Sequence, residues 1–352
     1  MKALIIKTSA LGDVVHALPV LAWLKSAEPM LAIDWLVEED FAPLLEDHPQ
    51  VRQVIRLRTK AWRRAGSLAG LREAWRLIGK LRGEDYDIAL DLQGNSKSGL
   101  FTLLSGAPVR YGYGRDGVRE WPNLVATNRK VALEDDKFHI TDRALAIARA
   151  AFPAGKDVMR AGPLPVDGAA AAAVEAQLGE AGLAAEPVVV LHYGTTWVTK
   201  LWPLSSWQKL AGRLAAKGRL KPVLTWGNDA ELEAVKAIQA ASNGRCLVWP
   251  RGRLKDLVAL LARADLVVGG DTGPVHIAAA VGTPTVSIFR ATDAARNAPR
   301  GEKHISLSAS MDCAPCLRKS CDLDEQCGAS ISVDQVAKAV FASLPASFLN
   351  TE

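Results

Sequence analysis

The sequence lacks several features that would place it in well-defined classes. It has no run of about 18 uncharged apolar residues, the minimum that suggests a transmembrane helix. Met1–Lys7 has only a few apolar residues between lysines, which predicts a first strand rather than a signal peptide. No G-x-G-x-x-G follows that strand, which argues against a nicotinamide enzyme. Gly94–Gly99 has the glycine spacing of a P-loop, but Leu100 and Phe101 stand where Lys and Ser or Thr belong.

The composition is that of an ordinary globular protein. Hydrophobic residues make up 49% of the 352 residues and charged residues 23%, and the formal net charge is +5. This length is sufficient for two domains. No RNA- or DNA-binding motif accompanies the basic residues, so we expect no nucleic-acid partner.

Strand and helix patterns alternate along the first half of the chain, which predicts a parallel sheet covered by helices. The predicted strands are Ala3–Lys7, Leu31–Val37, Val51–Leu57 and Ile88–Leu92. The predicted helices are Val14–Ser26, Leu68–Leu81 and Ser96–Leu104.

Pro153, Pro163 and Pro165 interrupt this alternation, and an alanine-rich helix pattern follows them. We therefore predict an N-terminal domain over residues 1–165, an interdomain passage over 166–186 and a C-terminal domain over 187–352. The predicted strands of the second half are Val188–Tyr193, Lys221–Trp226, Arg245–Val248, Leu266–Gly269 and Thr285–Phe289. The predicted helices are Ser205–Ala216, Asp229–Ala241, Leu254–Ala262 and Pro274–Val281. The predicted class is α/β, with two Rossmann-like doubly wound domains facing each other across a cleft.

The loop Gly269–His276 has the composition of a phosphate-binding turn. It joins a buried strand to a helix with Thr272 at the cap position and Pro274 in the first turn. Such a helix start offers free backbone N–H groups to an anion, and Gly273 lets a ligand approach the backbone. Similar turns also occur in doubly wound proteins that bind nothing there.

Three other loops follow predicted strands and carry polar side chains. Asp13 could act as a general base or as a helix cap. The hydroxyls of Thr195 and Thr196 precede Lys200, which could hold a phosphate or be an exposed loop lysine. An acid at Glu231 could accept hydrogen bonds from ribose hydroxyls, as acids do in dinucleotide folds.

Basic residues are dense between Arg52 and Arg82, where Trp62 and Trp75 are interleaved with them. The segment could be a solvated helix face or a surface for an acidic partner: anionic lipid, a phosphorylated sugar or nucleic acid.

The loops together resemble the lipopolysaccharide heptosyltransferases. Five motifs in the same order as in that family carry the resemblance: Lys7–Pro19, Trp35–Glu39, Asp91–Gly94, Lys200–Pro203 and Gly270–His276. The resemblance implies a GT-B fold with an acceptor domain first and a donor domain second. It implies inverting transfer of heptose from ADP-L-glycero-D-manno-heptose onto Kdo of a Kdo2-lipid A acceptor. The alternative within the family is transfer onto the first heptose.

The resemblance also assigns roles to residues. It matches Asp13 to the base, Glu231 to the ribose-binding acid, and Lys200 with Thr272 and Gly273 to the donor phosphates. Asp271 and His276 match residues that line the heptose and diphosphate, although a lone histidine is more often structural. The acceptor-binding positions are Lys60, Arg63, Arg64 and Arg119. The family works in the cytoplasm, peripherally on the inner membrane, and requires no cofactor.

Four cysteines near the C-terminus form a C-x2-C-x4-C-x5-C pattern: Cys313, Cys316, Cys321 and Cys327. The pattern is compatible with a structural metal such as zinc, with disulfides or with free thiols. We expect no catalytic role for it and no metal in the active site.

Two other classes share the predicted architecture. A non-catalytic two-domain sugar binder would usually be exported. A nucleotide-sugar epimerase would not need the basic surface at residues 60–64.

Overall fold

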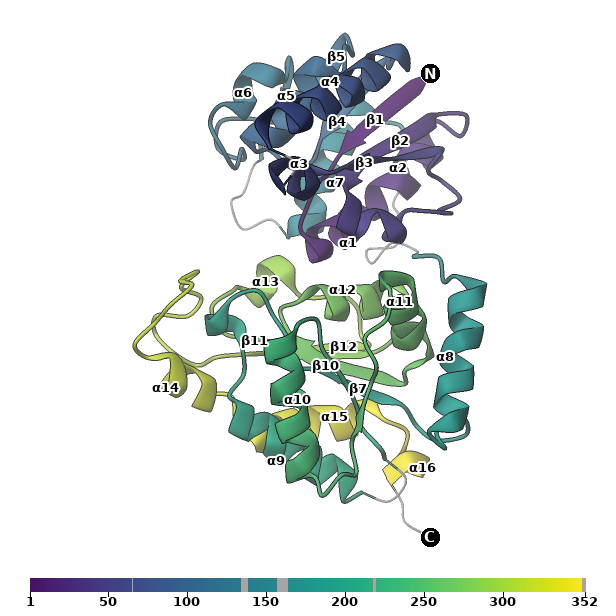
Figure 1. The fold of residues 1–352 in the computed structure, drawn as a ribbon. Coiled ribbons are helices and arrows are strands. Elements are labelled where there is room, and N and C mark those ends of the chain that lie inside the picture. Colours follow the sequence, from purple (N-terminus) through teal and green to yellow (C-terminus); the bar gives the residue numbers. More distant parts are fainter. Residues whose placement is uncertain (65, 134–138, 157–163, 218–219, 350–352) are drawn as a thin grey trace. The chain divides into compact units, whose positions relative to one another are not determined.

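The computed structural model describes residues 1–64, 66–133, 139–156, 164–217 and 220–349. It divides into two compact units, Met1–Pro165 and Val166–Glu352 (Figure 1). Each unit contains one six-stranded sheet in which every strand pair is parallel.

The N-terminal unit has the strand order β3-β2-β1-β4-β5-β6. Its strands are β1 (Lys2–Ile6), β2 (Ala32–Glu38), β3 (Gln53–Leu57), β4 (Ile88–Asp91), β5 (Val109–Tyr113) and β6 (Arg129–Val131). Its helices are α1 (Leu11–Ala17), α2 (Pro19–Ala27), η1 (Glu39–Leu44), α3 (Thr59–Arg64), α4 (Ser67–Gly83), α5 (Ser96–Leu104), α6 (Asn123–Ala126) and α7 (Ile140–Ala151).

Apolar side chains on both faces of β1 are buried. Leu4 and Ile6 pack in one core cluster with Ile78 of α4 and Phe101 of α5. Ile5 points to the opposite face, because side chains alternate along a strand, and it is fully buried as well. This two-sided burial is why the strand reads as a continuous apolar run in the sequence.

The C-terminal unit has the strand order β12-β11-β10-β7-β8-β9. Its strands are β7 (Val189–His192), β8 (Val223–Thr225), β9 (Leu247–Val248), β10 (Leu266–Gly270), β11 (Thr285–Phe289) and β12 (His304–Ser308). Its helices are α8 (Gly168–Glu180), η2 (Val198–Lys200), α9 (Leu204–Ala215), α10 (Asp229–Ala241), α11 (Leu254–Arg263), α12 (Gly273–Ala280), α13 (Ala294–Asn297), α14 (Asp324–Ala329), α15 (Val333–Ser343) and α16 (Ala346–Leu349).

The α/β class and the two doubly wound sheets predicted from the sequence are confirmed. In each unit the strand order reverses direction at one place, between β1 and β4 and between β7 and β10. Ligands of open α/β sheets bind beside the carboxyl ends of the strands at such a switch point. The loops singled out in the sequence at Asp13, Thr195 and Asp271 leave three of these four strands.

One predicted helix is wrong. The segment Val14–Ser26 was expected as a single helix, but the structure has two, α1 and α2, which meet at Leu18 and Pro19. Proline has no N–H to donate inside a helix, whereas it is well suited to a first turn, so α2 begins at Pro19. Among the described helices, none is both long and apolar enough to cross a bilayer.

Candidate active site

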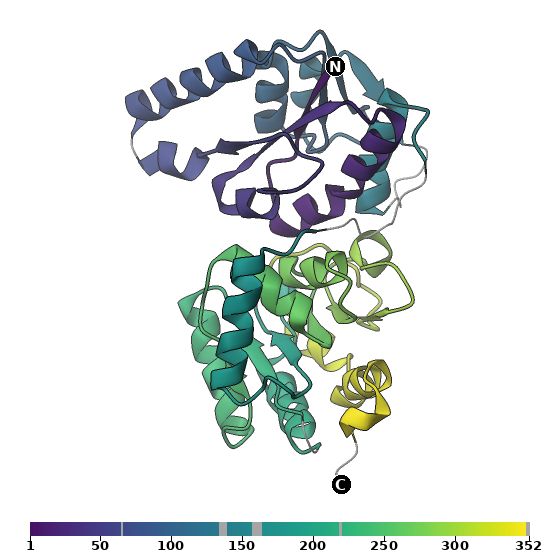
Figure 2. The ribbon, with the colours of Figure 1, turned by 90° about the vertical axis from the view of Figure 1, so that its right-hand side faces the viewer.

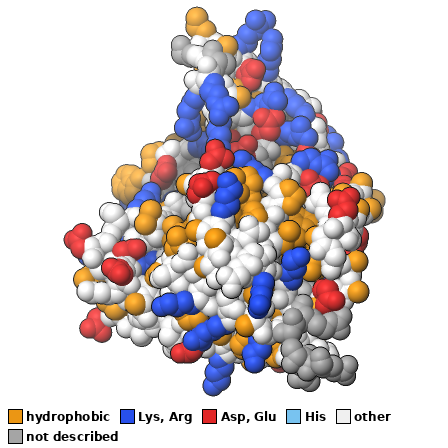
Figure 3. All heavy atoms as spheres, turned by 60° about the horizontal axis from the view of Figure 1, so that its bottom comes forward, with side chains coloured by type: hydrophobic (Ala, Val, Ile, Leu, Met, Phe, Trp, Pro, Cys, Tyr) orange, Lys and Arg blue, Asp and Glu red, His pale blue; other side chains and the backbone are white. Residues whose placement is uncertain are grey.

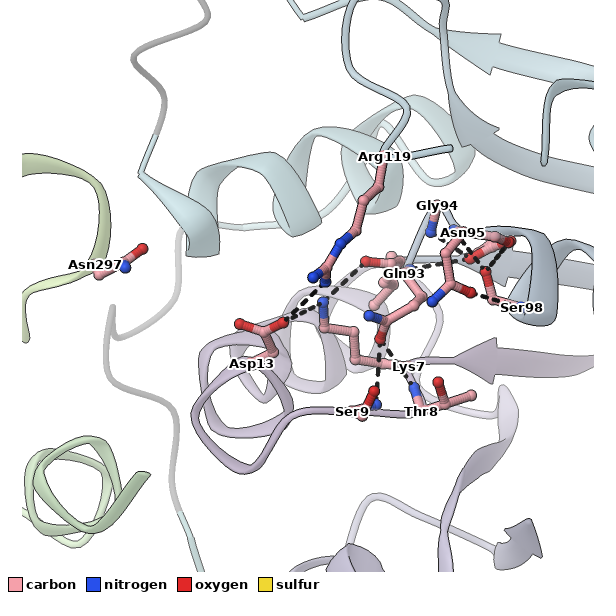
Figure 4. Close-up of polar contacts among 12 residues, drawn as sticks. Lys7, Thr8, Ser9, Asp13, Gln93, Gly94, Asn95, Ser98, Arg119 and Asn297 are labelled. Atoms are coloured by element: carbon pink, nitrogen blue, oxygen red, sulfur yellow. Dashed lines mark hydrogen bonds and ion pairs between the residues drawn. The ribbon is translucent and has the colours of Figure 1, made fainter. Parts of the chain in front are cut away.

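Asp13 lies in the first turn of α1, just after the loop that leaves β1. Its side chain is 31% exposed, and its Oδ2 lies 3.6 Å from Lys7 Nζ and 4.0 Å from Arg119 Nη1 (Figure 4). The N-cap of α1 is Ala10, and no side-chain capping bond is formed there. The capping alternative for Asp13 is therefore wrong, and the carboxylate stands partly exposed between two cations.

Lys7 is unusual because its side chain is almost completely buried. Lys7 is 5% exposed, and its ammonium donates a hydrogen bond to the carbonyl of Leu92, 3.3 Å away. Burial lowers the pKa of Lys7, while the negative charge of Asp13 opposes that change. A buried ammonium is costly unless it is paired, so the carboxylate of Asp13 stabilises the charged form of Lys7.

Gln93 connects the two loops at this switch point. Its Oε1 accepts hydrogen bonds from the backbone N–H groups of Thr8 at 3.2 Å and Ser9 at 3.3 Å (Figure 4). These bonds hold the loop after β1 against the loop after β4, and the Asp13 turn follows directly.

Asp91, at the end of β4, holds the loop that follows this strand through hydrogen bonds. Its buried carboxylate accepts hydrogen bonds from the N–H of Gly94 at 3.0 Å, Ser98 Oγ at 2.9 Å and Asn123 Nδ2 at 2.6 Å. Burial raises the pKa of Asp91, and these hydrogen bonds counteract the rise because they stabilise the anion.

Gly94 then positions Arg119. Gly94 has φ +71°, and a Cβ there would stand 2.9 Å from the ring of Tyr113. Its carbonyl accepts the backbone N–H groups of Arg119 and Glu120, each at 3.0 Å. A side chain at position 94 would therefore disturb the loop that brings Arg119 to Asp13.

The other expected acceptor residues lie on α3, which follows the carboxyl end of β3. Lys60 forms an exposed ion pair with Asp40 at 2.5 Å, and Arg63 and Arg64 are exposed. Within the described ranges, no direct contact joins these three residues to Asp13. Of the four expected positions, the structure brings Arg119 to the carboxylate.

In the C-terminal unit, Asp271 is the centre of a second polar cluster. This residue directly follows β10 and is 6% exposed. Its Oδ2 lies 2.6 Å from Lys200 Nζ and accepts a hydrogen bond from Thr292 Oγ1 at 2.8 Å. Its Oδ1 lies 3.2 Å from His276 Nε2. The structure thus brings together Lys200, Asp271 and His276, three residues that the sequence predicts for donor binding.

The charges in this cluster compensate one another. Burial disfavours the carboxylate of Asp271, but the hydrogen bond and charge of His276 and the ammonium of Lys200 outweigh that effect and hold the pKa of Asp271 well below its usual range. The backbone approaches closely here, since a Cβ on Gly270 would stand 3.3 Å from the carbonyl oxygen of Lys200.

The start of α12 differs in one detail from the expected phosphate turn. Thr272 occupies the N-cap position, but its hydroxyl makes no capping hydrogen bond. Thr272 and Gly273 are both partly exposed. The helix start therefore presents a hydroxyl that no capping bond engages, beside the Asp271 cluster.

Glu231 folds back onto the loop after β7. Its Oε2 accepts a hydrogen bond from the backbone N–H of Gly227 at 2.6 Å, and a Cβ on Gly194 would collide with that same oxygen. The structure thus places the acid beside the loop that carries Thr195, which is partly buried, and Thr196, which is exposed.

Sequence reasoning missed a pocket of about 210 Å³ next to this acid, at the carboxyl ends of β8 and β9. Trp226, Trp249 and Arg251 line it. The indole N–H of Trp226 donates to the carbonyl of Trp249 at 2.9 Å, and the Arg251 guanidinium lies 6.0 Å from the Trp226 ring centre. Aromatic residues directly after two neighbouring parallel strands were the signal that could have found it.

In the described part of the chain, the four C-terminal cysteines are not gathered into a group that could hold a metal ion. Cys313 is exposed, Cys316, Cys321 and Cys327 are half-buried, and all four are free thiols. Among the described residues, no three His, Cys, Asp or Glu side chains are arranged to hold a metal ion. The geometry does not fit the zinc hypothesis.

Comparison with known proteins identifies the family. The model of glycosyltransferase family 9 (heptosyltransferase) matches residues 74–326. Lipopolysaccharide heptosyltransferase 1 of Pseudomonas aeruginosa is 36% identical over 322 residues, covering 91% of this chain and 87% of that protein. The structure of Escherichia coli heptosyltransferase WaaC with ADP has a TM-score of 0.80 at 27% identity, covering 98% of this chain and all of that one.

A second solved structure, E. coli ADP-heptose lipopolysaccharide heptosyltransferase II, has a TM-score of 0.77 at 22% identity and covers 97% of this chain and 98% of that one. That likeness concerns the fold. Together, the family match, the curated relative and the two doubly wound units show that the chain is an enzyme of glycosyltransferase family 9, the heptosyltransferases.

Proposed function

We propose that the enzyme transfers L-glycero-D-manno-heptose from ADP-heptose onto Kdo of the lipopolysaccharide inner core, with inversion at the anomeric carbon. The observation that carries the proposal is the partly exposed Asp13 carboxylate at the switch point of the N-terminal sheet, held between Lys7 and Arg119. Such a carboxylate has the exposure that a general base needs to reach an acceptor hydroxyl. The relationship to lipopolysaccharide heptosyltransferase 1 of P. aeruginosa supports the substrate class.

The reaction is a single displacement. Asp13 takes the proton of the acceptor hydroxyl while the oxygen of that hydroxyl attacks the anomeric carbon of heptose. The bond from that carbon to the diphosphate oxygen breaks, and ADP leaves with the electron pair. One displacement inverts the configuration, and it needs no covalent enzyme intermediate.

The donor binds the C-terminal unit. Lys200 and the N-terminus of α12 at Thr272 and Gly273 hold the diphosphate, because an ammonium and free backbone N–H groups stabilise the charge on departing ADP. Glu231 accepts hydrogen bonds from the ribose, and Thr195 and Thr196 flank the phosphates. Solved structures of WaaC with ADP and with ADP-2-deoxy-2-fluoro heptose are consistent with such a donor.

The remaining predicted site residues bind either the donor or the acceptor. Asp271 and His276 line the heptose, and the pocket at Trp226 and Trp249 receives the adenine. Lys60, Arg63, Arg64 and Arg119 attract the carboxylate and phosphate groups of Kdo2-lipid A. The enzyme would therefore work on the cytoplasmic side of the inner membrane, where it meets a lipid-bound acceptor.

The second candidate is transfer onto the first heptose, as in heptosyltransferases of type II. A direct assay distinguishes the two. Purified enzyme receives ADP-heptose with either Kdo2-lipid A or its heptosylated product, and ADP release and product mass are measured. Product from Kdo2-lipid A alone is the expected result. Product from the heptosylated acceptor alone would assign the second transfer, and no ADP release from either would contradict both.

A further inference from the structure

Arg290, the first residue after β11, has a side chain that is almost completely buried. Lys and Arg side chains usually stand out from the molecular surface, as those in Figure 3 do, whereas Arg290 is 2% exposed. Burying a charged group is costly unless hydrogen bonds satisfy it. The partners of Arg290 therefore indicate which parts of the chain it holds together.

The Arg290 guanidinium joins the motif that contains Lys200 to the C-terminal part of the chain. Its Nη1 donates a hydrogen bond to the carbonyl oxygen of Leu201, the residue after Lys200. Its Nη2 donates to the carbonyl oxygen of Asp324 and, at 2.9 Å, to the carboxylate Oδ1 of the same residue. A planar guanidinium can bind two groups at once in fixed directions, which an ammonium cannot do. Arg290 thus fixes the backbone beside Lys200 relative to the start of α14.

The stretch that carries Arg290 also holds the partner of Lys200. Two residues further on, Thr292 Oγ1 donates to Asp271 Oδ2 at 2.8 Å, and Asn297 Nδ2 donates to the same oxygen at 3.3 Å. That oxygen lies 2.6 Å from Lys200 Nζ. The segment after β11 therefore fixes both members of the Lys200–Asp271 pair, one through its backbone and the other through its side chain.

The four cysteines belong to a segment, residues 309–331, that packs against the motif Lys200–Pro203 and the residue before it. We call residues 309–331 the cysteine segment. Three contacts join the two: Thr199 Oγ1 donates to the carbonyl oxygen of Arg318 at 2.5 Å, the indole N–H of Trp202 donates to that of Ile331 at 3.0 Å, and a Cβ on Gly328 would collide with the ring of Pro203. These contacts use the backbone of the cysteine segment and not its thiols.

The cysteine segment is itself fixed at both ends. It follows β12, which pairs with β11, and the N–H of Leu317 donates to the carbonyl oxygen of Ala291 at 2.8 Å. It leads into α15, whose Val336 and Val340 are fully buried in the core cluster that includes Ile288 of β11. Figure 2 shows the last helices of the chain, in yellow, packed against the C-terminal unit rather than extending away from it. The cysteine segment can therefore support the motif that contains Lys200.

We propose that Arg290 is a positioning residue for donor binding. Because Arg290 and the cysteine segment hold the backbone at Leu201, they keep the Lys200 ammonium beside Asp271, where it meets the diphosphate of the donor. Since its guanidinium is buried, Arg290 acts through Lys200 and not by contact with the donor. The inference rests on the proposed function, in which Lys200 binds the diphosphate, and it adds a role for Arg290 and for the cysteine segment.

The test measures ADP binding to the full-length protein by titration calorimetry, at a temperature where near-ultraviolet circular dichroism shows each variant to be folded. Arg290→Met removes the guanidinium and keeps an apolar chain in its place. We expect this variant to bind ADP about five- to tenfold more weakly, because a misplaced ammonium loses part of its hydrogen bond to the phosphates. Arg290→Lys keeps the charge but cannot bind Leu201 and Asp324 together, so we expect a smaller loss of about two- to threefold. Should Arg290→Met fail to fold, Arg290→Lys takes its place.

The control variant Arg213→Gln removes another arginine that binds the C-terminal part of the chain. Arg213 of α9 forms an ion pair with Asp334 of α15, and the two side chains are 47% and 81% exposed. Because exposed ion pairs contribute little, this variant should bind ADP like the wild type. Wild-type ADP affinity in the Arg290 variants would overturn the positioning role and would leave the proposed transfer intact.

A double-mutant cycle with Lys200 distinguishes positioning from general support of the C-terminal unit. If Arg290 acts through Lys200, its substitution should not weaken ADP binding further in the Lys200→Ala background, because the ammonium that it positions is gone. If the two losses multiplied instead, Arg290 would act independently of Lys200, and the positioning role would be wrong. Wild-type ADP affinity in Lys200→Ala alone would overturn both this role and the assignment of the diphosphate to Lys200.

Discussion

The pair formed by Lys200 and Asp271 allows a prediction on both stability and donor binding. The two charged atoms lie 2.6 Å apart, and the side chains are 13% and 5% exposed. Removing one partner of a buried pair costs about 3–5 kcal/mol, because the other charge is left unpaired. In Lys200→Ala, Asp271 keeps His276 at 3.2 Å and Thr292 at 2.8 Å. We therefore expect the free energy of unfolding to fall by about 3 kcal/mol, the lower limit of that range.

The same substitution should weaken ADP binding. A hydrogen bond to a charged group contributes about 1.5–3 kcal/mol, which corresponds to a loss of about 10- to 150-fold in affinity. The double variant Lys200→Ala/Asp271→Asn no longer buries an unpaired carboxylate, so it should recover most of the stability. It should not recover ADP affinity, because the phosphates still lack the ammonium.

Two measurements separate these effects: urea unfolding followed by tryptophan fluorescence, and titration calorimetry with ADP. Lys236→Ala is the matched control, since Lys236 forms an exposed pair with Glu233 at 2.8 Å in the same unit. It should leave both quantities unchanged. If Lys200→Ala bound ADP with wild-type affinity, Lys200 would not bind the phosphates. If its free energy of unfolding were that of the wild type, the ion pair with Asp271 would not contribute to stability.

Three further predictions concern single residues. Burial lowers the pKa of His192 to about 4, so the neutral ring is favoured in the folded protein. This preference contributes about 3 kcal/mol to the free energy of unfolding above pH 6.5, and the contribution should be lost as the pH falls toward 4. Urea unfolding of His192→Gln should show a smaller loss over that range, and an identical profile would contradict the assignment. Gly94→Ala should lower the free energy of unfolding by about 1–3 kcal/mol, because φ is +71° and the new Cβ would contact the ring of Tyr113. An unchanged melting temperature would contradict this prediction. Lys7→Met should reduce turnover at least about tenfold with ADP affinity intact, since Lys7 contacts Asp13 in the N-terminal unit; wild-type turnover would exclude Lys7 from the site.

Several elements were predictable from the sequence because local signals agree with the fold. Helices Ser96–Leu104 and Asp229–Ala241 have the predicted bounds, and asparagine side chains cap both at Asn95 and Asn228. Strand Thr285–Phe289 is also as predicted, since it is a buried strand with a neighbour on each side.

The missed strands lie toward the edges of the sheets. Strand β6, Arg129–Val131, is three residues long, mostly exposed and begins with two basic residues, so it has no apolar run. Strand β12, His304–Ser308, alternates in burial and lies at the other sheet's edge. Edge strands often carry charge and little apolar surface, which removes the pattern that sequence reasoning relies on.

Some residues of the site were likewise predictable from local motifs, and others were not. Asp13, Lys200 and Asp271 stand in recognisable motifs within the segments that follow β1, β7 and β10. Lys7 and Gln93 were missed as members of the site, because their roles depend on contacts across 85 and 84 residues of sequence, from Lys7 to Leu92 and from Gln93 to Ser9. Strand pairing between β1 and β4 creates those contacts, and no local pattern reports them.

The central claim is that Asp13 is the base of a heptosyl transfer. Asp13→Asn keeps the size of the side chain and removes its charge, so the most direct measurement is single-turnover transfer from ADP-heptose to Kdo2-lipid A by this variant and the wild type, with ADP affinity measured alongside. We expect the rate to fall about 10²- to 10⁴-fold while ADP affinity stays at the wild-type value. Transfer at the wild-type rate by Asp13→Asn would contradict the mechanism.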